Sequence, residues 1–361
     1  MIHSLLVTLL FLFAQDEGQY ERLLQQVRDA VRGFMEPEDG LSNSQFQYWN
    51  QVLQDVETVH RLKPNRETEI AYQLASGMKH YTRGNVSAAL EDFEFGLTVD
   101  PNQTAIFHFG IGLCYSASGK NAESEQAFRA AAERAAHWAR PRFALAALYT
   151  AAGRFREAEA AVNESIDRTG SDRAKGRQYL LLAQLHQFRG RSHDAEIALR
   201  RAVEVNASDA LLHDYFGLLV FKTGGKNAAL QVWKSGLDKV DQNSALMREI
   251  ALVENGIKPE AAWKDTFTQS TASRIEPAEW RAFRFQVKAG ETLRFRTESS
   301  VFAPFSALLS VEGKIVALHD IRSTYYSYLD YTAPAAGAYY LVVTSYLENR
   351  SGDFKIVRLT Q

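Results

Sequence analysis

Apolar residues recur at two different spacings along the chain. From residue 20 to residue 254 they return every three or four positions, as they do between Tyr20 and Phe34. Beyond Arg274 they alternate with polar residues in short runs separated by glycine-containing turns. The first spacing is that of amphipathic helices and the second that of half-buried strands. The pattern predicts a helical region followed by a separate all-β domain.

A longer period of about 34 residues lies over the helical part. Five glycines follow one another at intervals of 35, 34, 37 and 34 residues: Gly84, Gly119, Gly153, Gly190 and Gly224. Each glycine is the fifteenth residue of one repeat unit, and the five units are 70–103, 105–138, 139–172, 176–209 and 210–243. Positions eight, twenty and twenty-seven are always Gly, Ala or Ser, whereas position twenty-four is always bulky and apolar. Small residues opposite a large one predict two closely crossing helices, and each glycine predicts a left-handed residue that ends the first helix.

These spacings resemble the tetratricopeptide repeat (TPR), a helix-turn-helix unit of 34 residues. The family's aromatic residue at position four survives only as Tyr179 and its closing proline only as Pro101. The resemblance implies an α-solenoid with a concave groove that binds a protein or peptide partner. In the family, fixed positions of the first helix of each repeat line this groove. The residues at those positions in this sequence are Leu74, Met78, Tyr81, Ile106, Phe109, Leu113, Arg140, Phe143, Arg177, Leu180, Gln184, Phe188, Leu218 and Phe221.

The predicted groove is mainly apolar, with Phe109 and Phe143 at its centre. It lacks the Lys and Asn pattern with which one variety of the family grips a peptide carboxylate, so we expect no binding of that kind. Because large exposed apolar patches are rare on monomers, something must cover this surface. Two alternatives stay open: the N-terminal hairpin or the β domain folds into the groove, or a partner supplies an apolar helix or extended peptide.

Flanking segments complete the helical region. Residues 15–66 predict a helical hairpin that caps the array or forms a degenerate repeat, since the exposed end of a solenoid must be covered. Residues 244–258 predict a closing helix, and 259–273 a linker or an edge strand.

Seven short strands are predicted between residues 274 and 361, which favours an antiparallel sandwich or jelly roll. Two stretches stand out, Ala336-Gly337-Ala338-Tyr339-Tyr340-Leu341-Val342-Val343 and Gly352-Asp353-Phe354. Together with the aromatic strand at 280–285 they resemble the bacterial pre-peptidase C-terminal (PPC) domain, a sandwich appended to secreted proteins. The family's Asn before an acidic residue is replaced by His319, which weakens any implied calcium site.

The apolar run at 1–14 is too short to span a membrane and predicts a signal peptide cleaved after Ala14. An uncleaved anchor and a buried first helix are the alternatives. Export to the periplasm or the outside of the cell agrees with the PPC-like domain, and we expect no membrane span in the mature chain.

Charge and motifs exclude several classes of function. With 41 Lys and Arg against 43 Asp and Glu, the formal net charge is −2, which argues against nucleic-acid binding. No sequence pattern of a serine hydrolase, a zinc protease or a phosphate-binding loop occurs. We expect Cys114 to be buried as a small apolar residue. We expect His80 and His186 to be partly buried in the core, and His319 with Asp320 to lie at a solvated hairpin end.

The sequence therefore predicts a non-catalytic, exported scaffold that binds a protein or peptide partner, with no cofactor and no metal. The β domain would provide a second contact or attachment to a surface. The alternative is an accessory factor of an enzyme, in which the sandwich binds calcium or carbohydrate. A hydrolase is a third hypothesis, for which no catalytic residue can be named.

Overall fold

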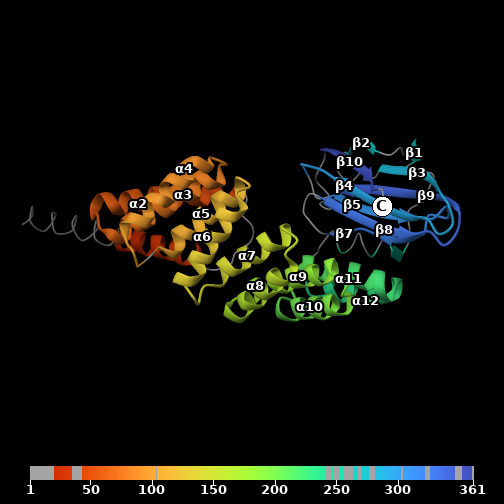
Figure 1. Ribbon diagram of the computed structural model, residues 1–361, viewed down its shortest axis with the longest axis horizontal. Helices are drawn as coiled ribbons and strands as arrows, with labels where there is room; N and C mark the ends of the chain where they lie inside the picture. The colour runs from red at the N-terminus through yellow and green to blue at the C-terminus, as the bar shows by residue number, and fades with distance from the viewer. Residues whose placement is uncertain are drawn as a thin grey trace, which may run out of the picture. The chain divides into compact units, whose positions relative to one another are not determined.

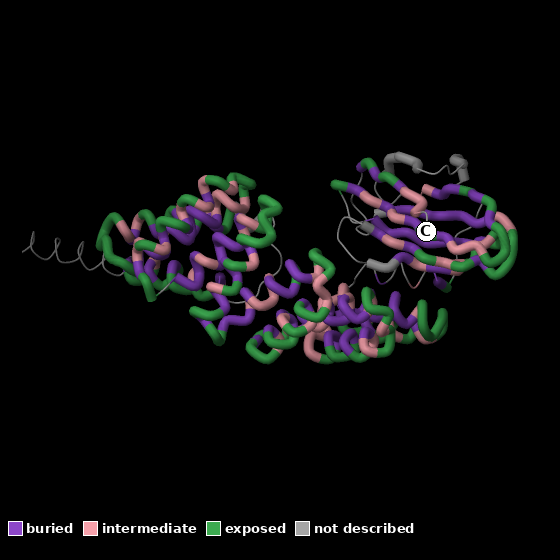
Figure 2. The backbone as a smooth tube through the Cα atoms, in the orientation of Figure 1, coloured by how far each residue is buried: buried purple, intermediate pink, exposed green. Residues whose placement is uncertain are grey.

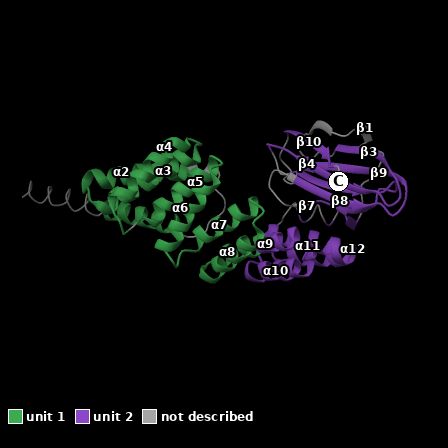
Figure 3. Ribbon diagram, in the orientation of Figure 1, with its two compact units in different colours: residues 1–181 green, residues 182–361 purple. Residues whose placement is uncertain are grey.

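The computed structural model describes residues 20–34, 43–102, 104–240, 246, 250, 253–254, 263–266, 270–275, 281–301, 304–321, 326–345 and 352–359. The predicted signal segment lies outside these residues. Two compact units divide the chain, one over 1–181 and one over 182–361 (Figure 3). Each unit is described by itself.

Helices make up the chain as far as residue 237 (Figure 1). A first helix covers 20–34, and α2 (Asn43–Leu62) follows. Five hairpins come next: α3 (Arg66–Thr82) and α4 (Val86–Val99), α5 (Ala105–Ala117) and α6 (Asn121–Arg134), α7 (Ala139–Ala151) and α8 (Phe155–Arg168), α9 (Asp172–Phe188) and α10 (Ser192–Val205), α11 (Ala210–Gly224) and α12 (Lys226–Leu237).

Local sequence explains where α2 stops and α3 starts. Pro64 disfavours helical backbone in the residue before it. Asn65 then caps α3: its side chain accepts a hydrogen bond from the Thr68 backbone N at 3.0 Å, while its own backbone N donates to Thr68 Oγ1 at 3.1 Å. This reciprocal pair is a capping box.

The predicted left-handed glycines are confirmed in four of the five hairpins. Gly84, Gly119, Gly153 and Gly190 have φ between 70° and 81°. In the fifth hairpin the prediction is wrong by one residue: Gly224 still belongs to α11, and the positive φ of 82° falls on Gly225. Either of two consecutive glycines can adopt this conformation without steric cost, so the pattern alone does not select between them.

The predicted fit of small positions against large ones is also confirmed. A Cβ atom added to Gly77 would lie 2.4 Å from the Phe93 ring, and one added to Gly112 would lie 2.5 Å from Phe128. Gly217 and Trp233 make the same contact in the fifth hairpin. These pairs set how closely the two helices of a hairpin approach each other.

The C-terminal part is a β-sandwich of two five-stranded sheets. The strands are β1 (Trp263–Thr266), β2 (Ser270–Ile275), β3 (Arg281–Val287), β4 (Thr292–Glu298), β5 (Pro304–Leu309), β6 (Ile315–Leu318), β7 (Asp320–Ile321), β8 (Tyr326–Thr332), β9 (Gly337–Ser345) and β10 (Gly352–Arg358). The first sheet has the order β1-β3-β9-β5-β6 and the second β2-β10-β4-β8-β7. All pairs are antiparallel except β1 with β3.

All seven predicted strands are present, and with the helical hairpins they confirm the predicted fold class of an α-solenoid followed by an antiparallel sandwich. β7 is a strand that the sequence pattern missed. The central core lies between the sheets and includes Phe283, Phe295, Leu308 and Leu341. Every residue of β5 is buried, so this strand is covered on both faces of the first sheet (Figure 2), whereas Arg284 and Gln286 of β3 are exposed.

Candidate functional site

The N-terminal part of the predicted groove is occupied by the chain's own first helix. This helix, residues 20–34, begins beside α2, where Tyr20 and Leu24 pack with Val59. The last residue of this helix that the structure describes is Phe34, whose ring lies 5.8 Å from that of Phe109, measured between centroids. Because Phe109 is a predicted groove residue, Phe34 of this helix covers part of the groove.

Four aromatic or cationic side chains surround Phe34. Its ring centroid lies 5.7 Å from that of Trp49 in α2 and 6.2 Å from that of Trp138, just before α7. The Arg140 guanidinium carbon stands 5.0 Å from the ring centroids of both Phe34 and Phe109. We call Trp49, Phe109, Trp138 and Arg140 the aromatic box. Edge-to-face rings and a stacked guanidinium are favourable arrangements for a buried aromatic side chain.

Arg140 also binds the end of this helix through the backbone. Its Nη1 donates a hydrogen bond of 2.5 Å to the carbonyl oxygen of Phe34. The last carbonyls of a helix have no intrahelical donor and carry partial negative charge, so a guanidinium is well suited to them. Burial raises the pKa of Tyr81, another groove residue, while Arg140 nearby acts in the opposite direction.

The fourteen predicted groove residues differ in exposure. Six are buried, which are Leu74, Met78, Ile106, Phe109, Leu180 and Leu218. Seven are partly buried, which are Tyr81, Leu113, Arg140, Phe143, Arg177, Gln184 and Phe221. Phe188 is exposed. Leu74, Met78, Ile106 and Phe109 are thus covered, while Tyr81, Leu113, Phe143 and Arg177 stay partly accessible.

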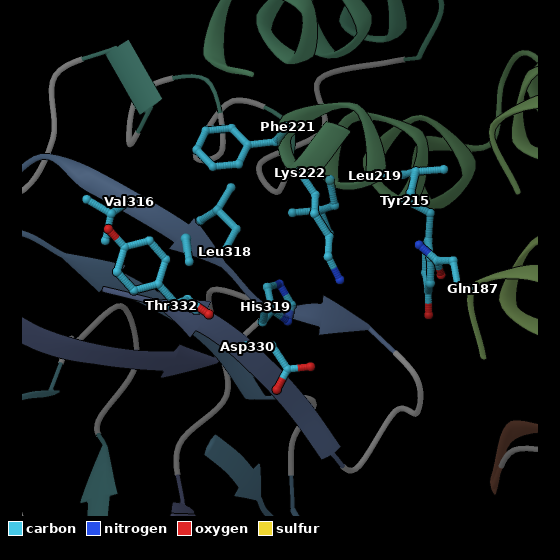
Figure 4. Close-up of a pocket in the computed structure, with 13 residues that line it drawn as sticks. Gln187, Tyr215, Leu219, Phe221, Lys222, Val316, Leu318, His319, Asp330 and Thr332 are labelled. Carbon is cyan, nitrogen blue, oxygen red and sulfur yellow. The ribbon is translucent and has the colours of Figure 1, made fainter. Parts of the chain in front are cut away.

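In the second unit, a cavity of about 250 Å³ lies between α11 and strands β6 and β8 (Figure 4). Leu218 and Phe221, two predicted groove residues, line it together with Leu318 of the first sheet. Lys222 and Asp330 also line it, and Asp330 forms an ion pair of 3.8 Å with Arg294. The β domain therefore covers the groove positions of α11.

His319 lies in this cavity wall, and here the sequence prediction is wrong. It is only 3% exposed, and its ring centroid lies 4.5 Å from that of Phe305. The sequence favours a solvated hairpin end over a cation site, because hard cations need several convergent oxygen ligands that it does not supply there. The fold instead packs the outer face of the first sheet, on which His319 lies, against α11. The side chain of Asp320 lies outside the described residues.

Two sequence predictions that concern chemistry can be compared with the structure. Cys114 is fully buried, and burial raises the pKa of its thiol to about 12, so the thiol stays protonated at neutral pH. Within the described residues, no group of three or more His, Cys, Asp or Glu side chains is placed to hold a metal ion.

The sequence did not identify Phe34, Trp49 or Trp138 as site residues. Trp138 is the last residue of the repeat 105–138, and the sequence indicates Phe34 and Trp49 only as parts of amphipathic stretches. A tryptophan next to a groove position was the available signal. The helices of the described part are also too short or too polar for any of them to cross a bilayer.

Comparisons with known proteins give limited information. No protein-family model and no curated protein matches the chain. Similar solved structures include PilF of Pseudomonas aeruginosa (17% identity, 52% of this chain and 86% of that chain, TM-score 0.45). A second is a tetratricopeptide repeat protein from Parabacteroides merdae (14% identity, 66% of this chain and 87% of that chain, TM-score 0.43). A third is BtubC from P. vanneervenii (14% identity, 64% of this chain and 98% of that chain, TM-score 0.45). At these values we transfer no function from them.

Proposed function

We propose that this protein is a non-catalytic scaffold that binds a protein partner through the concave face of its helical repeats. The observation that supports this most directly is the helix over 20–34, because its residue Phe34 packs against Phe109 and accepts a hydrogen bond from Arg140, two predicted groove residues. Helix-in-groove binding, with apolar anchors on one face, is a recurrent mode of recognition between proteins.

The accessible part of the groove is the proposed point of entry for the partner. Phe143 is partly exposed, Ala147 one turn later is exposed, and Arg177 on α9 is partly exposed. Interface anchors are often aromatic residues and arginines, and this part of the surface offers one of each. We further propose that the protein is exported and that the β-sandwich, through its resemblance to PPC domains, provides a second contact or attachment to a surface.

A site-specific crosslink tests the function. A photo-crosslinking amino acid replaces Phe143 in the full chain, and the matched control carries it at Ile197, which is 42% exposed on α10. After illumination in the native cells, we expect a defined protein adduct from position 143, identified by mass spectrometry, and none of the same mass from position 197. Equal adducts from both positions, or none from 143, would contradict the proposal.

A further inference from the structure

The helix over 20–34 contacts two predicted groove residues, Phe109 and Arg140, and what is inferred from this rests on the proposed function. We propose that this helix is an internal ligand of the groove, and that the partner competes with it by presenting an amphipathic helix of the same pattern. That pattern has a bulky aromatic residue, equivalent to Phe34, whose backbone carbonyl faces Arg140.

The path of the helix is that of a ligand and not that of a further repeat. A repeat contacts only its neighbours in a solenoid. The helix over 20–34 instead contacts three successive hairpins: Arg28 pairs with Glu67 of α3 at 2.7 Å, and Phe34 contacts Phe109 of α5 and Arg140 of α7. α2 packs along α3, where a capping helix would lie.

One face of the helix holds it in place. The residues buried to 6% exposure or less are Tyr20, Leu24, Val27, Ala30 and Phe34. They are spaced by four, three, three and four residues and so form one stripe. Glu21, Gln25, Gln26, Arg28, Asp29 and Arg32 are exposed on the other side. A helix bound by one stripe can be replaced by another helix with the same stripe, whereas a helix buried all round cannot.

The recognition is directional because of the aromatic box. Phe34 fills the box with its ring and at the same time offers its carbonyl oxygen to Arg140. A helix that ran in the opposite direction would bring backbone N–H groups to Arg140, and these cannot accept a hydrogen bond. The partner helix should therefore run parallel to residues 20–34.

The polar contacts of the resident helix are weak enough for another helix to replace it. The ion pair between Arg28 and Glu67 is partly exposed, with 43% and 49% of the side-chain surfaces accessible, and exposed ion pairs contribute little. The resident helix owes its advantage to its covalent link with α2, since a tethered ligand acts at an effective concentration on the order of millimolar. A free helix should bind weakly until the resident one is released.

A labelled peptide with the sequence of residues 18–36 tests this in the full chain. We expect the Phe34→Ala protein, whose resident helix has lost its anchor, to bind the peptide at least about tenfold more tightly than the wild type. The Gln26→Ala protein is the control, because Gln26 is on the exposed side of the same helix; it should bind as weakly as the wild type. A peptide carrying Phe34→Ala should not bind measurably to any of the three.

Hydrogen exchange of the wild-type protein provides a measurement that does not depend on how the variant folds. Excess peptide should reduce the protection of amides 20–34 and leave that of α10 unchanged. The inference is wrong if the peptide neither binds the Phe34→Ala protein nor changes protection in the wild type.

The two proposals fail in different ways. A partner that crosslinks at position 143 but is not displaced by the peptide would overturn the helix pattern and leave the scaffold function intact. Peptide binding with displacement, but no partner at position 143, would support the helix recognition and count against the scaffold function.

Discussion

Single glycines determine how closely the paired helices of the repeats can pack. At Gly112 there is no room for a side chain, because an added Cβ atom would stand 2.5 Å from Phe128. Gly33 differs: nothing lies within 4 Å of an added Cβ atom, and its φ is not positive. The same substitution should therefore have opposite effects at the two positions.

We predict that Gly112→Ala lowers the free energy of unfolding by about 1–3 kcal/mol, the usual cost of overpacking a core. Gly33→Ala, the control, should leave it unchanged or raise it by up to about 1 kcal/mol, because alanine is the better helix former. Urea denaturation followed by circular dichroism measures both. Similar losses for the two variants would show that close packing is not the cause.

Neighbouring helices are also joined by a charged cluster on α6, α7 and α8. The Glu125 carboxylate pairs with Arg154 at 2.5 Å and with Arg129 at 2.6 Å, and it accepts a hydrogen bond of 3.2 Å from the Tyr149 hydroxyl. Arg154 pairs with Glu157 as well, and its guanidinium stands 4.3 Å from the Tyr149 ring centroid. The hydrogen bond from Arg154 is the main reason why the pKa of Glu125 is lowered.

Replacing Glu125 by Gln should destabilise the protein by about 1 kcal/mol or less, because the side chains of Arg129 and Arg154 remain 55% and 37% exposed to solvent. The difference from wild type should shrink at about 1 M salt, which screens such pairs. It should also shrink below roughly pH 4.3, since a carboxyl whose pKa is lowered by folding loses its stabilising effect as it becomes protonated. Denaturation at two salt concentrations and two pH values measures this.

Glu133→Gln is the control for the charged cluster, because Glu133 is exposed on the same helix. A loss of stability equal to that of Glu125→Gln, or one that does not depend on salt, would contradict an electrostatic role for Glu125.

Within the second unit, the last hairpin and the β-sandwich share apolar packing. Leu218 and Trp233 belong to a buried cluster against which Ile315 and Leu318 of β6 pack. The same cluster contains Leu246 and Val253, which are helical within the region predicted as a closing helix. The sandwich is thus part of the packing of the solenoid's last repeat.

We predict that Leu318→Glu lowers the stability of the second unit by about 1–3 kcal/mol, because it places a charge in this apolar cluster. It should also increase hydrogen exchange in α11 and α12, although the substitution is in a strand. Val311→Glu, at a position that is 52% exposed, is the matched control. Unchanged exchange in α11 of the Leu318→Glu protein would show that the sandwich does not support the last repeat.

The sequence by itself determined the helical hairpins, four of the five turn glycines, the small-to-large packing pairs and seven strands. These features depend on neighbouring residues or on a short period, so a single unit carries enough information. β7 is only two residues long, and a period of two cannot be recognised in so short a segment.

Only the tertiary structure decided what covers the groove. A phenylalanine at position five, such as Phe109, is apolar whether it faces water, a partner or the chain's own helix, so its identity does not show what lies on it. In the first unit residues 20–34 cover Phe109, and in the second unit β6 packs against α11. Periodicity specifies which face of a helix is apolar. What covers that face depends on segments far away in the sequence, and these meet it only once the chain has folded.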